Sequence, residues 1–282
     1  MKRKLRVLAT SWAAALLLSG TPAAQAWAPE EPLQIAKRFV GKGQWPRMKN
    51  YLCCEAAQQA KAHTLGQQIP ANLQRECRLL QQNNASAVVA VELRDTATTA
   101  DFYLHFVKEA DDWKLQAVRG LASTNLGRQM LQLMEGMPAA EVSRYNQSHP
   151  DADHTFTVGN LKLWVGADAQ IIEHFNRNRA GFDDVVRTVQ TRGYFAEPTP
   201  AAEQQANTDP AIKAQLQQLY IRRLTRRATA CGSCLEFLIG GVTNDTVGLL
   251  YQPNPAEVPA MSPARIIVIR PLGGGWYLYK TT

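Results

Sequence analysis

The stretch "DFYLHFVKEADDWKLQAVRG", residues 101–120, decides the fold expected for the first half of the chain. Apolar and polar residues alternate through 102–106 and again through 113–117, a period of two that is typical of strands with one buried face. Between these runs, Ala110-Asp111-Asp112 predicts a hairpin turn. The same alternation occurs upstream in "SAVVAVELRD", residues 86–95. Together the runs predict an antiparallel meander of at least three strands.

Helical patterns precede this meander. We expect one helix in "EPLQIAKRFV" (31–40) and another in the segment 44–62, where Pro46 stands at a helix-start position. A third helix is expected over "ANLQRECRLLQQ" (71–82), which carries Cys77. The first half is therefore expected to consist of helices followed by an antiparallel sheet.

The middle of the chain predicts further helices and one strand. Residues 125–150 indicate one helix or two, broken around 136–138, and "HTFTVGNLKLWVG" (154–166) indicates a strand. The clearest helix of the chain follows, because five apolar side chains recur on one side of it. They are Ile171, Phe175, Phe182, Val186 and Val189.

The last part of the chain predicts a second sheet. A loop rich in Pro, Ala and Gln is expected over 196–209, and Asp209 with Pro210 predicts the start of a helix that continues through Leu224. Four strand-like runs, separated by Gly, Pro and Asn turns, come next. They are "CLEFLIGG" (234–241), "TVGLLYQ" (246–252), "ARIIVIRPL" (264–272) and "GWYLYKTT" (275–282). The expected fold class is α+β, with helices followed by an antiparallel sheet in both halves.

These patterns divide the chain into four segments. We expect a signal peptide over 1–26, a first domain over 27–125, a connecting helix and strand over 126–166, and a C-terminal α+β domain over 167–282. The mature length suits one large domain or two small ones.

The N-terminal segment predicts export. It has a cationic start, an apolar core over 9–18 and a small-residue motif at 24–26, so we expect cleavage before Trp27. Its four basic residues leave with it, which lowers the formal net charge from +7 to +3. A nearly balanced mature chain gives no electrostatic reason to expect a nucleic acid partner, and no later run predicts a retained membrane helix. We expect a periplasmic protein that inserts no helix in the membrane and holds no cofactor.

The order of helices and strands, with the hairpin "FYLHFVKEADDWKLQAVRGL", resembles the NTF2-like (cystatin-like cone) superfamily as it occurs in exported bacterial proteins. The resemblance covers roughly residues 29 to 125. It implies helices packed on an antiparallel sheet, but not one activity, because that fold serves enzymes, ligand binders and scaffolds alike. The C-terminal half is similar to uncharacterised bacterial envelope proteins that end in a Gly-Trp-Tyr-Leu-Tyr-basic-Thr strand.

The resemblance also implies a candidate pocket. Enzymes of the superfamily build acid-base sites from Asp, Tyr and His side chains that line the cone. Here Tyr103 and His105 share one face of a predicted strand, and Asp101 or Glu92 would complete such a set. No positional motif of those enzymes is matched, and a solvent-facing Tyr and His on an antiparallel sheet is the favoured interpretation.

The pair in Cys231-Gly232-Ser233-Cys234 admits three interpretations. A redox pair of the thioredoxin type lies at a helix N-terminus, whereas this pair precedes a strand-like run. A zinc site needs four ligands, and the pair supplies two. If Gly232 and Ser233 form a type II′ hairpin turn, the flanking cysteines lie about 5.5 Å apart, which suits a disulfide. The structural bridge is the favoured interpretation.

The other cysteines of the mature chain are Cys53, Cys54 and Cys77, which makes an odd total. In an oxidising compartment, two bridges and one free thiol are the simplest arrangement. We expect Cys77 to pair with Cys54 or with Cys53, which would pin two helices of the first domain.

The remaining charged motifs predict no metal site and no catalytic residue. The spacing in "SHPDADH" (148–154) fits no EF-hand loop, and Glu173-His174 lacks the second histidine of a zincin. A candidate surface is formed by four arginines at the end of an expected helix, where complementing the helix dipole is favoured over binding an anion. They are Arg222, Arg223, Arg226 and Arg227.

None of these motifs matches a catalytic pattern, so we expect a non-enzymatic protein that binds another envelope or secreted protein. An immunity protein against a periplasm-acting toxin is one concrete version. The alternatives are a small-ligand binder or enzyme that uses the cone pocket, and a thiol-disulfide role for Cys231 and Cys234.

Overall fold

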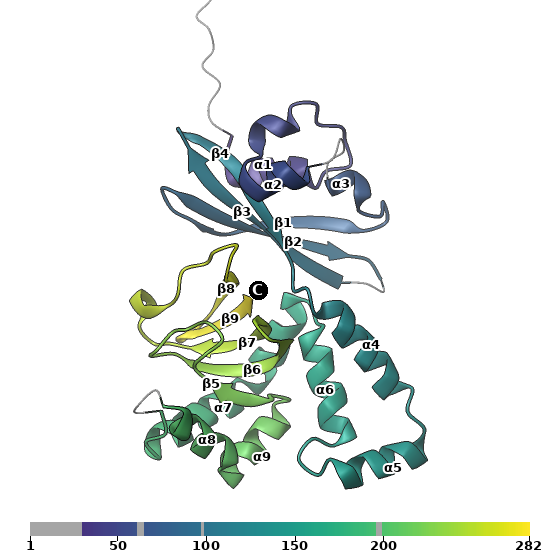
Figure 1. Ribbon diagram of the computed structural model, residues 1–282, viewed down its shortest axis with the longest axis vertical. Coiled ribbons are helices and arrows are strands. Elements are labelled where there is room, and N and C mark those ends of the chain that lie inside the picture. The colour runs from purple at the N-terminus through teal and green to yellow at the C-terminus, as the bar shows by residue number, and fades with distance from the viewer. Residues whose placement is uncertain (1–29, 61–64, 97–98, 196–198) are drawn as a thin grey trace, which may run out of the picture.

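Two antiparallel sheets lie one above the other in the computed structural model (Figure 1). The structure describes residues 30–60, 65–96, 99–195 and 199–282, so the predicted signal peptide lies outside the described residues. Sheets and helices are both abundant, and the predicted α+β class is confirmed. No helix of the described ranges is long and apolar enough to cross a membrane.

The first sheet, called sheet A here, has four strands in sequential order. The strands are β1 (Gln74–Gln82), β2 (Ser86–Arg94), β3 (Thr99–Glu109) and β4 (Asp112–Arg119). The predicted meander is therefore confirmed and extended by one strand. Ala110 and Asp111 form the β3–β4 turn with positive φ angles of 47° and 76°.

The helix predicted over 71–82 is wrong, because most of this segment is strand β1. β1 pairs with β2, and Cys77 lies opposite Val91. The turn between the two strands is fixed by Asn83, whose side-chain Oδ1 accepts hydrogen bonds from the backbone N–H groups of Ala85 and Ser86. β1 is an edge strand with many charged side chains, so its sequence lacks the apolar alternation that identified the inner strands.

Short helices cover one face of sheet A. They are α1 (Pro32–Phe39), the 3-10 turn η1 (Met48–Tyr51), α2 (Cys54–Gln59) and α3 (Leu65–Gln68). Their apolar side chains pack against the residues of β2, β3 and β4 that alternate toward them. The centre of this core consists of Ile35, Phe39, Val89, Val91, Leu104, Phe106 and Leu115.

Three helices connect the two sheets. They are α4 (Thr124–Glu135), α5 (Ala139–Ser148) and α6 (His154–Trp164). The predicted break around 136–138 is confirmed, but the strand predicted over 154–166 is wrong. Asp153 caps α6, because its side chain accepts a hydrogen bond of 2.7 Å from the N–H of Phe156. The alternation of polar and apolar residues in this segment is typical of a strand. The Asp153 cap and the packing of Leu161 and Trp164 in the core of the second half stabilise a helix instead.

The second sheet, called sheet B here, has five strands in the order β5-β6-β7-β9-β8. The strands are β5 (Arg223–Thr225), β6 (Leu235–Val242), β7 (Asp245–Tyr251), β8 (Ile266–Gly273) and β9 (Trp276–Thr281). All four predicted strand-like runs are confirmed. A short 3-10 turn, η2 (Pro255–Glu257), lies between β7 and β8.

Helices cover one face of sheet B as well. They are α7 (Asp168–Thr191), α8 (Pro200–Thr208) and α9 (Pro210–Gln218). The apolar stripe predicted on α7 is buried as expected, and its rings pack against Phe237 and Trp276 of the sheet at centroid distances of 5.3 to 5.7 Å. α8 occupies much of the predicted loop 196–209, because Thr199 caps it through the N–H of Ala202.

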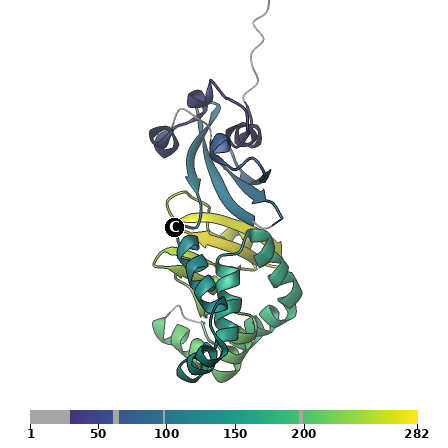
Figure 2. The same ribbon diagram turned by 90° about the vertical axis from the view of Figure 1, so that its right-hand side faces the viewer.

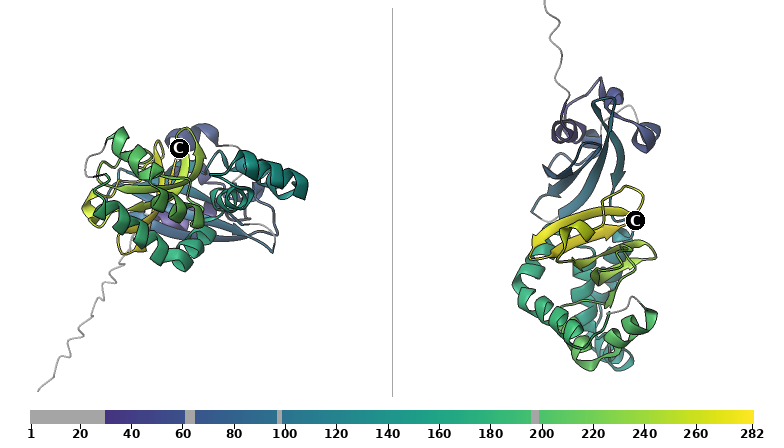
Figure 3. Two further views of the ribbon diagram at one scale, coloured as in Figure 1. Left: turned by 90° about the horizontal axis from the view of Figure 1, so that it is seen from below. Right: turned by 90° about the vertical axis from the view of Figure 1, so that its left-hand side faces the viewer.

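The faces of the two sheets that no helix covers meet each other. Figure 2 and the right panel of Figure 3 show strands β8 and β9 directly beneath sheet A. Val88, Ala90 and Tyr103 of sheet A pack there against Ile267 and Val268 of β8. We call this interface the seam. It joins the predicted first and last domains into one packed body.

Candidate functional site

The four residues of the predicted candidate pocket lie in the seam. Glu92 is on β2, and Asp101, Tyr103 and His105 are on β3. Tyr103 is 0% and His105 2% exposed, so the expectation of a solvent-facing Tyr and His is wrong. Sheet B covers the face on which they lie. Because burial lowers the pKa of His105 to about 4, this imidazole is neutral at physiological pH.

Asp168, the first residue of α7, is the centre of the seam's polar contacts. It is fully buried, and its Oδ1 accepts a hydrogen bond of 2.7 Å from the Tyr103 hydroxyl. Lys280 Nζ lies 2.8 Å from the same oxygen, and Arg270 lies 3.2 Å from Oδ2. The backbone N–H of Asp168 also donates a hydrogen bond to the carboxylate of Asp101. Asp168 therefore ties strands β3, β8 and β9 to the start of α7.

Two further carboxylates extend this network. Asp101 lies 3.7 Å from Lys280, and Glu92 lies 3.6 Å from Arg270. Three acids thus surround two bases in a region that is almost closed to water. Such a cluster is stable only if its members pair with one another, because an isolated buried charge costs several kcal/mol.

The carboxyl groups of the seam differ in their protonation. Burial opposes ionisation of Asp168, but the Lys280 ammonium, the Tyr103 hydroxyl and the Arg270 guanidinium together hold its pKa below the usual value. Burial also disfavours the charged form of Lys280, but Asp168 and Asp101 raise its pKa. For Asp101, burial wins over the attraction of Lys280 and raises the pKa to about 6. Asp101 therefore titrates closer to neutral pH than Asp168 does.

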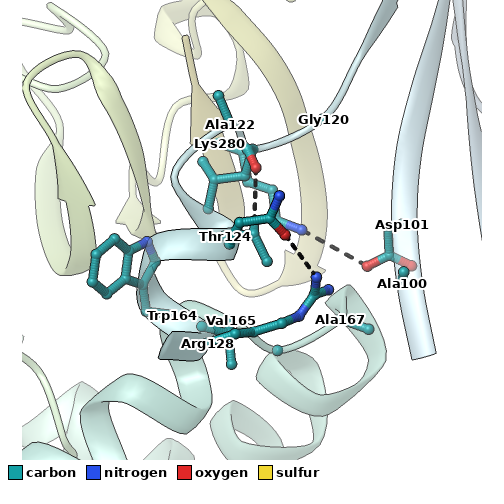
Figure 4. A pocket seen from close by; sticks show the side chains of 13 residues that line it. Ala100, Asp101, Gly120, Ala122, Thr124, Arg128, Trp164, Val165, Ala167 and Lys280 are labelled. Carbon is teal, nitrogen blue, oxygen red and sulfur yellow. Dashed lines mark hydrogen bonds and ion pairs between the residues drawn. The ribbon is translucent and has the colours of Figure 1, made fainter. Parts of the chain in front are cut away.

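A pocket of about 330 Å³ opens at the edge of the seam, between β3, α4, α6 and β9 (Figure 4). Lys280, Arg128 and Asp101 point toward one another across it in Figure 4. Asp101 Oδ1 and Trp164 Nε1 are buried and have no hydrogen-bond partner among the described residues. Of the four predicted pocket residues, Asp101 lines this pocket.

A groove of about 380 Å³ lies on another side of the molecule, between α6 and the α9–β5 connection. Met130 of α4 lies at its border, and Phe156, Leu161, Leu216 and Ile221 supply apolar walls. Its polar lining includes Asp151, Asn160, Lys213, Arg222 and Arg223.

The predicted arginine surface is divided by the fold. α9 ends at Gln218, so the four arginines do not complement a helix end as expected. Arg222 and Arg223 are exposed and line the groove. Arg226 instead lies 5.1 Å from the centroid of the Phe195 ring and donates to the Gly232 carbonyl, and Arg227 pairs with Glu203 at 3.4 Å.

One exposed feature was missed by the sequence interpretation. Leu126, Met130 and Leu133 of α4 are 47%, 40% and 73% exposed. They are spaced at i, i+4 and i+7, so they share one side of the helix. This spacing was visible in the sequence, but it is usually a sign of a buried face. We call these three residues the α4 stripe.

The Cys231–Cys234 disulfide is present as predicted, with its Cα atoms 5.3 Å apart. Cys234 N–H donates to the Cys231 carbonyl, which closes a turn. The turn is not the expected type II′, because Gly232 does not adopt a positive φ angle. Both cysteines are buried, and strand β6 rather than a helix follows them.

The predicted bridge between Cys77 and Cys54 or Cys53 is wrong, because all three are free thiols. The reason is the wrong secondary structure assigned to Cys77. It lies on β1 opposite Val91 and not on a helix packed beside Cys54. Cys53 and Cys54 instead contact each other.

No family model, curated protein or solved structure matches this chain.

Proposed function

We propose that this chain is an exported, non-enzymatic protein that binds an acidic, amphipathic segment of another envelope or secreted protein. The binding surface is the groove together with the adjoining α4 stripe. The observation that carries the proposal is the combination of apolar walls with two exposed arginines that have no acidic partner among the described residues.

The charges of the groove differ in whether they are paired. Lys213 lies 2.6 Å from Asp151 and is neutralised by it. Arg222 and Arg223 form no ion pair with any residue that the structure describes. Unpaired guanidinium groups beside apolar surface favour a partner that carries carboxylates, because arginine binds them with two parallel hydrogen bonds.

The α4 stripe adds apolar area next to the groove. Met130 belongs to both the groove and the stripe. Contiguous apolar patches on an exposed surface mark sites of interaction with other molecules. Burying such side chains against a partner contributes about 25 cal/mol per Å² of apolar area.

The partner segment is expected to bind as a helix rather than as an added strand. Strand β5 lies at the edge of sheet B, and its free side is occupied by Asn207. The amide of Asn207 donates to the Leu224 carbonyl at 2.9 Å and accepts from the Leu224 N–H at 2.8 Å. With this edge blocked, we expect the partner to bind as an amphipathic helix in the groove.

Export and the NTF2-like resemblance of the first half are part of this proposal and are supported by the sequence patterns alone. An immunity protein that neutralises a periplasm-acting toxin remains one concrete version. Its rigid, two-sheet body would present the groove without rearrangement.

The test is a comparative capture from the envelope and secreted fractions of the native cell, using the full chain exported with its own N-terminal segment. Met130→Glu and the double variant Arg222→Glu/Arg223→Glu are compared with Leu79→Glu and Arg78→Glu on sheet A. Leu79 is a matched control, because it is 38% exposed against 40% for Met130.

We expect one stoichiometric protein that is captured by the native chain and both controls and is lost with both groove variants. A partner that is retained by the groove variants would exclude the groove as its binding site. A partner lost equally with the sheet A controls would point to the other end of the molecule.

A small-ligand function is the second candidate, and the unpartnered atoms of the seam pocket favour it. Arg128 bonds to Asn125 at 3.2 Å and pairs with no described carboxylate. A small zwitterion, such as an amino acid, would offer a carboxylate to Arg128 and Trp164 Nε1 and an ammonium group to Asp101 Oδ1. This pocket takes the place of the cone pocket that the sequence suggested.

Thermal melting of the native chain in the presence of free amino acids tests this candidate. We expect an amino acid to raise the melting temperature more than its amine-only and carboxylate-only analogues do. Arg128→Gln, a change at an exposed residue, should abolish the difference. Equal melting temperatures with and without each amino acid would remove the candidate.

A further inference from the structure

Two thiols and one carboxylate meet at the other end of the molecule from the groove. Cys53 precedes α2, Cys54 is its first residue, and Glu109 ends β3. The two sulfur atoms and a carboxylate oxygen of Glu109 all lie within 4.8 Å of one another. The contact is fixed by the main chain, because Cys53 N–H donates to the Leu115 carbonyl of β4 at 3.0 Å.

The backbone at Cys54 explains why two adjacent thiols share a side. Cys54 has φ of +53°, in the left-handed region that residues other than glycine rarely adopt. In an extended chain, adjacent side chains point to opposite sides. Here the sulfur atoms are 2.7 Å apart.

The charges around the thiols favour a bound cation. The nearby lysines are occupied elsewhere: Lys108 lies 3.8 Å from Asp111, and Lys114 donates to the Asn50 carbonyl at 2.7 Å. Glu109 forms no ion pair with any residue that the structure describes, so two thiols and one unpaired carboxylate converge at this point.

We propose that Cys53, Cys54 and Glu109 bind one thiophilic divalent cation of the zinc class. Binding replaces the two thiol protons, so one M²⁺ and two S–H groups give two metal-thiolate bonds and release two protons to solvent. Glu109 supplies the third ligand. The exposed position of Cys54 leaves the fourth place to water, as in open zinc sites.

The geometry requires one small adjustment. Zinc-thiolate bonds are about 2.3 Å long, which places two thiolates on a tetrahedral ion roughly 3.8 Å apart. The Cys54 side chain must therefore rotate outward, which its exposure permits. The bound ion would join α2 to the end of the β3–β4 hairpin. The sequence interpretation missed this site because Glu109 is far from the two cysteines along the chain.

The test uses Zn²⁺ and Cd²⁺ with the full chain, purified with its thiols reduced. We expect one Zn²⁺ per chain by competition with a chelating indicator, and a cadmium-thiolate absorption band. Cys53→Ser/Cys54→Ser should abolish both signals. Glu109→Gln should weaken Zn²⁺ binding by about tenfold or more, as changes around metal ligands do.

Cys77→Ser is the matched control, because Cys77 is a free, half-buried thiol outside the cluster. Its Zn²⁺ stoichiometry should equal that of the native chain. Absence of stoichiometric Zn²⁺ binding, or equal binding by the double serine variant, would overturn the proposal. So would finding Cys53 and Cys54 permanently disulfide-linked in protein that binds no Zn²⁺. The groove variants should bind Zn²⁺ normally, so this result is independent of the proposed partner.

Discussion

Charged residues lie beside apolar surface in both the seam and the groove. They are buried and paired in the seam, whereas two of them are exposed and unpaired with described residues in the groove. In the seam, Asp168 and Lys280 are buried and lie 2.8 Å apart. In the groove, Arg222 and Arg223 are exposed and lack an acidic partner among the described residues. Paired charges in a closed interface hold a structure together, whereas unpaired charges on an open surface are available to another molecule.

Reactive side chains and exposed side chains lie in different regions of the molecule. Asp101, Tyr103, His105 and Glu92 have the chemistry of an acid-base site, yet their side chains hold two sheets together. The α4 stripe has no reactive chemistry, yet its three apolar residues are exposed. Residues that are buried and paired therefore stabilise the fold, whereas exposed residues are available for binding another molecule.

The largest expected effect is in the seam. Asp168→Asn removes the charge that neutralises Lys280 and Arg270, which leaves buried cations without full compensation. We expect the free energy of unfolding to fall by about 3–5 kcal/mol. Denaturant titration measures it, with Asp112→Asn at an exposed position as the control, expected within about 0.5 kcal/mol of the native chain. A loss below about 1 kcal/mol for Asp168→Asn would mean that the seam is not held by these charges.

A smaller effect is expected for the groove, and in binding rather than stability. Met130→Glu places a negative charge beside the acidic segment proposed as partner. We expect the affinity for the captured partner to fall about tenfold, which is about 1.4 kcal/mol. The free energy of unfolding should change by less than about 0.5 kcal/mol, because Met130 is 40% exposed. Titration calorimetry and denaturant titration of Met130→Glu and Leu79→Glu provide the measurement. Equal affinities of the two variants would contradict the groove.

A third expected effect is the pH dependence of the seam's stability. The pKa of Asp101 is raised to about 6 in the folded chain, above the 3.8 expected in the unfolded chain. The folded state therefore holds this proton more tightly, and the resulting contribution is present at low pH and lost as the pH rises through about 6.

Asp101→Asn should remove that contribution. The melting temperature of the native chain relative to the variant should fall between pH 4 and pH 7. Asp168, with its lowered pKa, contributes in the opposite sense, because its stabilisation is lost as the pH falls below 3.8. If the melting temperatures of the native chain and of Asp101→Asn change with pH in parallel, burial does not raise the pKa of Asp101.

The fold was predictable where the local pattern agreed with the tertiary contacts. The alternation through β2, β3 and β4 and the α7 stripe identified their elements correctly. The pattern failed at β1, an edge strand rich in charged side chains, and at α6, where alternating residues mimic a strand. Asp153 at the start of α6 is a usable N-cap signal, but its motif was interpreted as a turn before a strand.

The sites were less predictable, because they depend on contacts between distant parts of the chain. Nothing local to Asp168 indicates that it meets Lys280 near the C-terminus or Tyr103 of β3. The Cys231–Cys234 bridge was predictable because both cysteines lie in one short loop. Cys77 was assigned a wrong partner because its own secondary structure was assigned wrongly.

The most direct test of the difference between groove and seam is hydrogen exchange of the full chain, measured with and without its captured partner. We predict slower exchange in α4 and around residues 221–225 when the partner is bound, with β3 and the first turn of α7 unchanged. Protection of β3 and α7, with no change in α4, would contradict the account and make the seam the functional region.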